Sequence, residues 1–181
     1  AARGVKIAEG LPRLAEQIIE TLERTGFPAE KLEVEITESV IMEGVDRLTR
    51  TLQTLRDAGI ELCIDDFGTG YSSLSYLHRF PMDTLKIDQA FVREMHLARE
   101  NYQIVRTIRM LAGSLDMSVI AEGIENEEQL SELRKLGCEY GQGYLFSKPL
   151  EADEIEPYLV RAQESVFEGA VEDERAKPSF A

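Results

Sequence analysis

Cysteine, basic residues and long apolar runs are all scarce in this sequence, and each shortage narrows what the chain can be. The two cysteines, Cys63 and Cys138, stand alone in apolar or strand-like contexts. They favour a reduced, cytoplasmic protein over a disulfide-linked framework. The chain has 20 basic residues against 34 acidic ones, a formal net charge of −14. A nucleic-acid polymer is therefore excluded as the main partner, because its binding needs clustered Lys and Arg.

Segments that target a chain to a membrane are also missing from the sequence. The longest stretch without a charged residue or histidine, Phe67–Leu77, is rich in Gly and Ser. It falls short of the about 20 apolar residues that span a bilayer. No basic start followed by an apolar run marks a secretory signal. The chain begins Ala1-Ala2-Arg3, so we expect a processed chain or a fragment, whose full-length protein is membrane-tethered, if at all, through upstream segments.

Apolar spacing alternates between the periods of helices and strands along the chain. Strands are predicted at Leu32–Thr37, Ile60–Asp65, Thr84–Ile87, Ser118–Ala121 and Tyr140–Tyr144. Helices are predicted around Leu11–Leu22, Val45–Leu55, Ser72–Arg79, Asn101–Leu115, Asn126–Leu136 and Glu151–Gln163. Residues 1–163 are thus expected to form one domain, and the polar, unpatterned residues 164–181 a disordered tail.

This alternation predicts the α/β class, with a parallel sheet and helices outside it. An open doubly wound sheet and a (β/α) barrel of eight strands both fit the pattern. A barrel typically takes about 250 residues, so a barrel interpretation means that part of the barrel is missing from this sequence. Such a piece is expected to leave open sheet edges and an uncovered apolar interior.

Each predicted strand delivers polar side chains at or near its C-terminal end. They are Glu35 on the first strand, Asp65 and Asp66 on the second, Lys86 and Asp88 on the third, Glu122 on the fourth and Gln142 on the fifth. One such residue alone is usually a solvated loop residue, but the repetition indicates a site, because ligands collect at this end of parallel sheets. Converging carboxylates are tolerated when divalent cations neutralise them. With no His at any strand end, Mg²⁺ or Mn²⁺ is favoured over zinc.

A Gly-rich segment, Asp66–Ser73, follows the acidic pair of the second strand. Its two glycines allow the backbone to approach a phosphate closely. It is not a P-loop, because no Gly-Lys-Ser/Thr follows, and its spacing does not fit a dinucleotide fingerprint.

The ordered motifs of this chain resemble those of EAL-domain cyclic di-GMP phosphodiesterases. The motifs are Glu35–Ser39, Asp65–Leu74, Leu85–Asp88, Ala121–Glu125 and Gln142–Pro149. The resemblance covers about residues 1–160. It implies a TIM-like barrel, incomplete here with about five of eight strands, that hydrolyses cyclic di-GMP to linear pGpG with two Mg²⁺ or Mn²⁺ ions in bacterial signalling.

The resemblance also implies roles for individual residues. By position, Glu35, Asp65 and Glu122 resemble metal ligands, and Asp66 resembles the ligand of the second metal. Lys86 is similar to the lysine that helps to activate the nucleophilic water, and Gln142 to the glutamine near that water. Glu38 resembles the glutamate that holds the Gly-rich loop, and Asp88 and Glu125 resemble outer site residues. The loop residues that would contact substrate are Gly68, Thr69, Gly70, Tyr71 and Ser72.

The chain departs from the family pattern at its start. The tripeptide Glu-Ala-Leu occurs nowhere in it, and Asn101 and Asn126, its two asparagines, are not at the position of the family's Asn ligand. The resemblance therefore implies that three strands and two ligands precede Ala1, and residues 1–181 alone are expected to hydrolyse cyclic di-GMP poorly.

Two further hypotheses stay open at this point. One is an inactive module that binds cyclic di-GMP or another protein, and the other, of lower weight, is a different Mg²⁺-dependent barrel enzyme acting on small acids. The expected partners are cyclic di-GMP, a second copy of the chain, and an upstream sensor or diguanylate cyclase-like domain.

Overall fold

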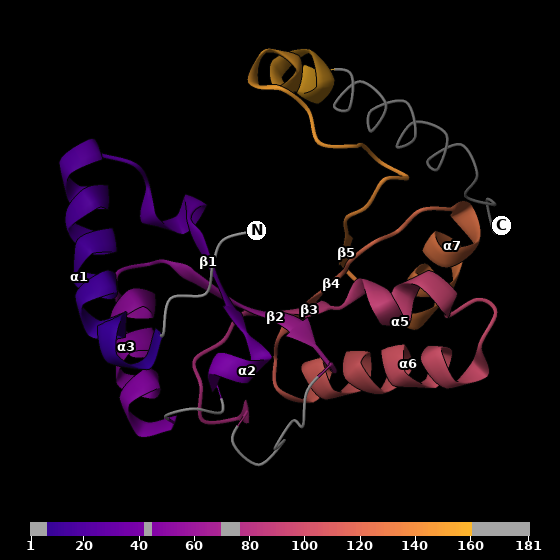
Figure 1. Ribbon diagram of the computed structural model, residues 1–181, viewed down its shortest axis with the longest axis horizontal. Coiled ribbons are helices and arrows are strands. Elements are labelled where there is room, and N and C mark those ends of the chain that lie inside the picture. Colours follow the sequence, from indigo (N-terminus) through magenta and orange to yellow (C-terminus); the bar gives the residue numbers. More distant parts are fainter. Residues whose placement is uncertain (1–6, 42–44, 70–76, 161–181) are drawn as a thin grey trace, which may run out of the picture. The chain divides into compact units, whose positions relative to one another are not determined.

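The computed structural model describes residues 7–41, 45–69 and 77–160, and within them five parallel strands lie side by side in one sheet (Figure 1). In chain order, which is also the spatial order, they are β1 (Glu33–Thr37), β2 (Glu61–Phe67), β3 (Thr84–Ile87), β4 (Ser118–Ala121) and β5 (Tyr140–Gly141). The prediction is confirmed to the residue for β3 and β4, whereas β5 is shorter than predicted.

Helices precede the first strand and connect three of the four pairs of successive strands in the described residues (Figure 1). They are α1 (Ile7–Thr25), η1 (Ala29–Lys31), α2 (Glu38–Ile41), α3 (Val45–Asp57), α5 (Gln89–Glu94), α6 (Arg99–Ser114) and α7 (Glu127–Leu136). Helix α3 packs on β2, and α6 packs on β3 and β4. Parallel neighbours in sequential order with helices outside are the arrangement of a TIM-like barrel, here with five strands.

The described chain divides into two compact units at Phe146 and Ser147. The first contains the whole sheet, and in the second residues 152–160 are helical, within the range predicted for the last helix. The predicted tail and most of the helix predicted at Ser72–Arg79 lie outside the described residues. Within the described part of the chain, no helix has the length and apolar character needed to cross a membrane.

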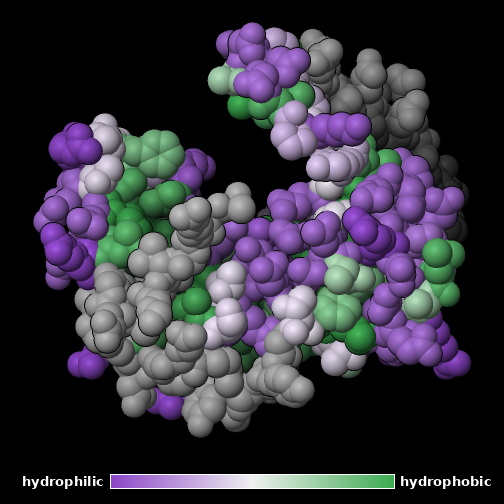
Figure 2. All heavy atoms as spheres, viewed as in Figure 1, coloured by the Kyte–Doolittle hydropathy of each residue, from purple (hydrophilic) through white to green (hydrophobic). Residues whose placement is uncertain are grey.

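Alternating strand residues face either the helices or the opposite side of the sheet. The helix-facing residues, including Ile64, Leu85 and Val119, are 0% exposed and belong to the hydrophobic core. On β3 the alternate positions are Thr84 and Lys86. This face of β3 therefore carries buried polar groups, and Ile120 pairs with Lys86 on the neighbouring strand. The uncovered apolar interior stays a prediction. Figure 2 shows hydrophilic residues over the middle of the sheet-bearing unit and hydrophobic ones along α1.

Helix α7 has the ends that its sequence predicts. Asn126 accepts a hydrogen bond from the backbone N–H of Gln129, whose side chain accepts one from the backbone of Asn126, so the predicted capping box is confirmed. Gly137 ends the helix in the left-handed conformation, at φ 76°, which glycine adopts without a Cβ clash. These caps fix where the segment after β4 enters the helix.

Partly exposed carboxylates close the N-terminal ends of two strands in the same way. Asp83 Oδ2 accepts a hydrogen bond from the Leu62 N–H at 3.0 Å and pairs with Arg56. Glu139 Oε2 accepts one from the Val119 N–H at 3.1 Å and pairs with Arg109 at 2.6 Å. In both cases, a carboxylate that precedes one strand satisfies the first buried N–H groups of the strand before it.

We predict that Glu139→Ala lowers the free energy of unfolding by about 1–3 kcal/mol, because it leaves the buried Val119 N–H without an acceptor. Glu139→Gln should cost less, since its amide oxygen still accepts. Urea titration measures both effects. The matched control is Glu132→Ala on α7, which removes a mostly exposed ion pair with Lys135 and should change stability by about 1 kcal/mol or less. Equal losses in Glu139→Ala and Glu132→Ala would contradict the assignment.

Candidate functional site

The centre of the acidic site is the side chain of Lys86 on β3, which is 5% exposed. Its Nζ lies 2.7 Å from Glu35 Oε1, 3.1 Å from Asp65 Oδ1 and 2.7 Å from Glu122 Oε1. These carboxylates come from β1, from β2 and from the residue after β4, so one ammonium joins three strands. A buried cation needs such partners, because an uncompensated charge inside a protein is very costly.

An irregularity in β2 brings two consecutive acids to this site. Ile64 pairs with Leu85 and Phe67 pairs with Ile87, so Asp65 and Asp66 together oppose Lys86 alone. Asp66 has a left-handed backbone, with φ 54°. Without this bulge, neighbouring side chains would point to opposite faces of the sheet. The bulge is therefore what allows both aspartates to reach the same site.

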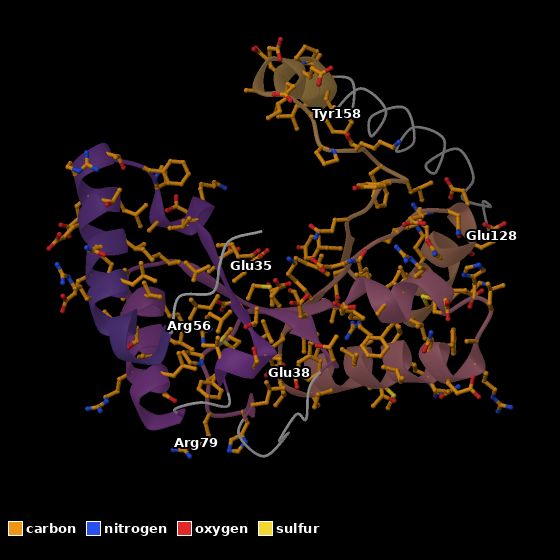
Figure 3. The ribbon with its side chains drawn as sticks, viewed as in Figure 1. Glu35, Glu38, Arg56, Arg79, Glu128 and Tyr158 are labelled. Atoms are coloured by element: carbon orange, nitrogen blue, oxygen red, sulfur yellow. The ribbon has the colours of Figure 1, made fainter. Side chains whose placement is uncertain are left out.

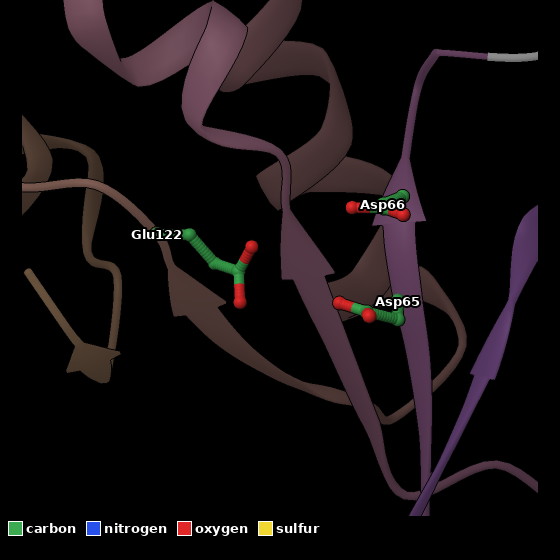
Figure 4. A group of neighbouring side chains, drawn as sticks. All are labelled: Asp65, Asp66 and Glu122. Atoms are coloured by element: carbon green, nitrogen blue, oxygen red, sulfur yellow. The ribbon is translucent and has the colours of Figure 1, made fainter. Parts of the chain in front are cut away.

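Three carboxylates of the site lie close enough together to share a cation. Figure 4 shows Asp65 and Asp66 at the end of β2 and Glu122 after β4, with their oxygens pointing toward one another across β3. One oxygen from each lies within 4.8 Å of the others. Asp65 Oδ1 is buried and, among the described residues, makes no hydrogen bond, since its contact with Lys86 is an ion pair without hydrogen-bond geometry. A buried anionic oxygen of this kind fits a metal ligand.

Glu35 and Glu38 are three residues apart in the sequence but contact different groups, and Figure 3 labels both. Glu35, on β1, donates no ligand atom to the three-carboxylate group and binds Lys86 instead. Glu38 begins α2 and is 6% exposed. Its Oε2 accepts a hydrogen bond from the backbone N–H of Gly68 at 2.9 Å. Glu38 thus contacts the beginning of the Gly-rich loop.

Gln142 is placed beside Glu122 by backbone pairing. Its N–H donates to the Ala121 carbonyl, and its own carbonyl accepts from the Ile124 N–H. The side-chain Nε2 then donates to Glu122 Oε1 at 2.6 Å. Gly143 follows with its backbone against Ile124, where an added Cβ would lie 2.2 Å from the Ile124 carbonyl oxygen. This close approach fixes the segment that carries Gln142.

The remaining predicted site residues lie at the margin of the acids. Asp88 caps α5, accepting a hydrogen bond from the Ala90 N–H at 2.7 Å, and its side chain also contacts Asp66. Glu125 faces Arg93 at 3.6 Å. Thr69 turns its hydroxyl back onto the Asp66 carbonyl at 2.9 Å. Gly70, Tyr71 and Ser72 lie outside the described residues.

Burial and neighbouring charges shift the pKa of the lysine in opposite directions, but both raise the pKa of the acids. Burial by itself lowers the pKa of Lys86, but contacts with Glu122, Glu35 and Asp65 outweigh it and raise that pKa. Burial raises the pKa of Asp66, and the neighbouring Asp65 raises it further. Burial also raises the pKa of Glu33, with Glu35 and Glu61 adding to the effect. Without a bound metal, the neighbouring carboxylates of the site therefore repel one another.

Two features near the site, a short helix and a buried side chain, could not be found from the sequence. Helix α5 is not predicted, and Gln129, at 1% exposed the most buried polar residue among those whose burial is described, is recognised only as part of a capping box. Its apolar surroundings give no signal in the sequence beyond that box. A cavity of about 780 Å³ between the α5–α6 connection and α7 contains none of the site acids, so it is separate from the site described above.

The chain matches the family model for the EAL domain over residues 9–149. It is 42% identical to the cyclic di-GMP phosphodiesterase NbdA of Pseudomonas aeruginosa over 150 residues, which are 83% of this chain and 19% of that protein. The chain spans about a fifth of the length of the curated relatives it matches.

Solved structures give the same result. The EAL domain of DcpA from Mycobacterium smegmatis matches with a TM-score of 0.79 and 37% identity, covering 86% of this chain and 68% of that one. BlrP1 of Klebsiella pneumoniae, in a complex with manganese and cyclic di-GMP, matches with a TM-score of 0.70 and 36% identity over 76% of this chain and 35% of that one. The chain belongs to the EAL domain family, and its fold is the α/β, TIM-like barrel type, here with five strands.

We predict that Glu33→Gln stabilises the metal-free protein at neutral pH. A carboxyl whose pKa is raised on folding binds its proton more tightly in the folded state, so its contribution is complete below the unfolded pKa and lost as pH rises through the folded one. The gain should therefore shrink as the pH falls from neutral through the raised folded pKa, and it should be absent below the unfolded value of about 4.5. Thermal unfolding across pH tests this, with Glu16→Gln on the exposed side of α1 as the matched charge control. A gain that grows with acid would contradict it.

Proposed function

We propose that this chain supplies the greater part of the catalytic acids of a domain that hydrolyses cyclic di-GMP to linear pGpG with two Mg²⁺ or Mn²⁺ ions. The observation that carries the proposal is the convergence of Glu35, Asp65 and Glu122 on the buried Lys86. Each of these residues stands in one of the ordered family motifs. NbdA, named a cyclic di-GMP phosphodiesterase, supports the substrate assignment.

The acids present fit divalent cations. Asp65, Asp66 and Glu122 would hold the ions, with Glu35 joining when Lys86 shifts its contacts, and the buried, non-hydrogen-bonded Asp65 Oδ1 is the best-placed ligand atom. When bound, the ions supply Lewis-acid activation of water and stabilise charge on the transferring phosphate. Structures of BlrP1 with calcium and with manganese, each with cyclic di-GMP, support an oxygen-ligated cation site.

The side chains of the chain divide the remaining work of hydrolysis. Water adds to the phosphorus of one phosphodiester, the bond from phosphorus to the 3′-oxygen breaks, and that oxygen takes a proton to give pGpG. The Lys86 ammonium orients the attacking water and screens the negative phosphate. Gln142 holds Glu122 in place through its 2.6 Å hydrogen bond, and we propose that it also contacts that water.

The margin of the site is proposed to position the substrate. Glu38 holds the Gly-rich loop through Gly68, and the loop residues Gly68–Ser72 contact the dinucleotide. Asp88 and Glu125 orient the acids from outside. Because the relatives are much longer than this chain, we further propose a sensor or diguanylate cyclase-like domain elsewhere in the protein. We also propose that this domain is cytoplasmic and assembles as a homodimer.

The direct test is Asp65→Asn in the full-length protein. This change keeps the shape of the side chain but removes the charge of the best-placed ligand, so hydrolysis with Mn²⁺ should fall by about 100-fold or more. Product formation is followed by chromatography of pGpG. Asp116→Asn is the matched control, because Asp116 is an exposed aspartate outside the acidic site.

The outcomes separate the hypotheses. Normal turnover by Asp65→Asn would remove Asp65 from the site. A wild-type protein that binds cyclic di-GMP but releases no pGpG would instead favour an inactive binding module.

A second prediction concerns Glu38. Glu38→Ala should weaken Mn²⁺ and substrate binding several-fold by releasing the Gly68 N–H, whereas Glu38→Gln should retain most of the binding because its amide oxygen can still accept. Calorimetric titration with Mn²⁺ and with cyclic di-GMP in the presence of Ca²⁺ measures both. If Glu38→Ala and Glu38→Gln weaken binding equally, the charge of Glu38 matters rather than its hydrogen bond, and the anchoring role is wrong.

A further inference from the structure

Helix α5, a six-residue element after β3, contacts both loops that carry the acids of the site. Gly68 lies two residues beyond Asp66, and Gly123 directly follows Glu122. The structure places α5 against each of these glycines, so a single short helix meets the loop after β2 and the loop after β4.

At the first loop, the contact is made by the ring of Phe91. A Cβ added at Gly68 would lie 2.8 Å from Phe91 Cε2 and 3.2 Å from Ile108 Cδ1, and Gly68 has φ 100°. The other side of Gly68 is held by Glu38, which accepts its N–H. Gly68 is thus clamped between the Phe91 ring and the Glu38 carboxylate, with no room for a side chain.

At the second loop, α5 makes three contacts. A Cβ added at Gly123 would lie 2.5 Å from Gln89 Cβ. Gln129 Nε2 donates to the Arg93 carbonyl at 2.9 Å, and the Arg93 side chain faces Glu125 at 3.6 Å. The other end of the Gln129 amide, Oε1, accepts from the Glu125 N–H at 2.7 Å and the Asn126 N–H at 3.2 Å.

The burial of Gln129 makes these hydrogen bonds costly to lose. The side chain is 1% exposed, and a buried amide whose partners are removed leaves unpaired groups on both sides. Gln129 therefore joins α7 and the loop that precedes it to the last turn of α5, 36 positions earlier in the sequence.

We propose that α5 couples the two acid-bearing loops, with Phe91 on α5 and Gln129 on α7 as the positioning residues. The proposal rests on the proposed function, because it concerns the same acids, but its physical content is independent of catalysis. Loosening one loop loosens the other through α5, so the Asp65–Asp66 pair and Glu122 keep their relative position only while both contacts are intact. Coupling of this kind is reciprocal.

The test is backbone hydrogen exchange of the metal-free, full-length protein. Gln129→Met removes the amide but keeps the volume, so exchange at Glu125 and Asn126 should rise directly. Coupling adds a rise at Gly68, whose acceptor Glu38 is untouched, of about 2- to 30-fold, the range that coupling energies along such networks give. Phe91→Leu should do the reverse: a direct rise at Gly68 and an indirect one at Glu125.

Leu55→Val is the control. Leu55 lies in the core on α3, at 3% exposed, so this change lowers stability without touching either loop and should not single out Gly68 or Glu125. The proposal is overturned if each variant affects only its own loop. Because neither metal nor substrate is present, a failed hydrolysis assay would leave this result standing. A Mn²⁺ titration of the double variant adds a second readout: coupling predicts a loss of affinity smaller than the product of the single losses.

Discussion

The structure of the site depends on one interaction, the contact of the Lys86 ammonium with carboxylates from three directions. Glu35, Asp65 and Glu122 would repel one another without it, and Lys86 would be an uncompensated buried charge without them. The parallel sheet makes this mutual compensation of charge possible, because it brings the carboxyl ends of successive strands to one edge. Cations that enter the site must compete with this ammonium for the same oxygens.

The second constraint is the bulge in β2. A regular strand would send Asp65 and Asp66 to opposite faces, one into the hydrophobic core beside Ile64. Because the bulge sets Asp65 and Asp66 together opposite Lys86, neither carboxylate enters the hydrophobic core. The left-handed backbone of Asp66 is the local consequence of the bulge. The loop that follows is then fixed through Gly68 by Glu38 on one side and Phe91 on the other, so the bulge and the loop are held as one unit.

Much of this arrangement could be predicted from the sequence, for identifiable reasons. Strand β3 alternates polar and apolar residues and β4 is a short apolar run before Glu122 and Gly123, so even their ends could be predicted. Asn126 with Gln129 indicated the start of α7. The convergence of polar residues at strand ends located the site. The bulge could not be predicted, because it arises from the register between β2 and β3. Helix α5 is too short for a periodic pattern, and the contacts of Gln129 with Arg93 join residues 36 positions apart.

The most direct measurement of the central claim is anomalous diffraction from crystals of the full-length protein with Mn²⁺ and cyclic di-GMP. The account predicts manganese peaks in contact with Asp65, Asp66 and Glu122, with the scissile phosphate beside them and Lys86 Nζ turned from at least one of its present carboxylate partners toward the phosphate or its attacking water. Manganese bound elsewhere, or Lys86 still held by Glu35, Asp65 and Glu122 with no metal among them, would contradict it.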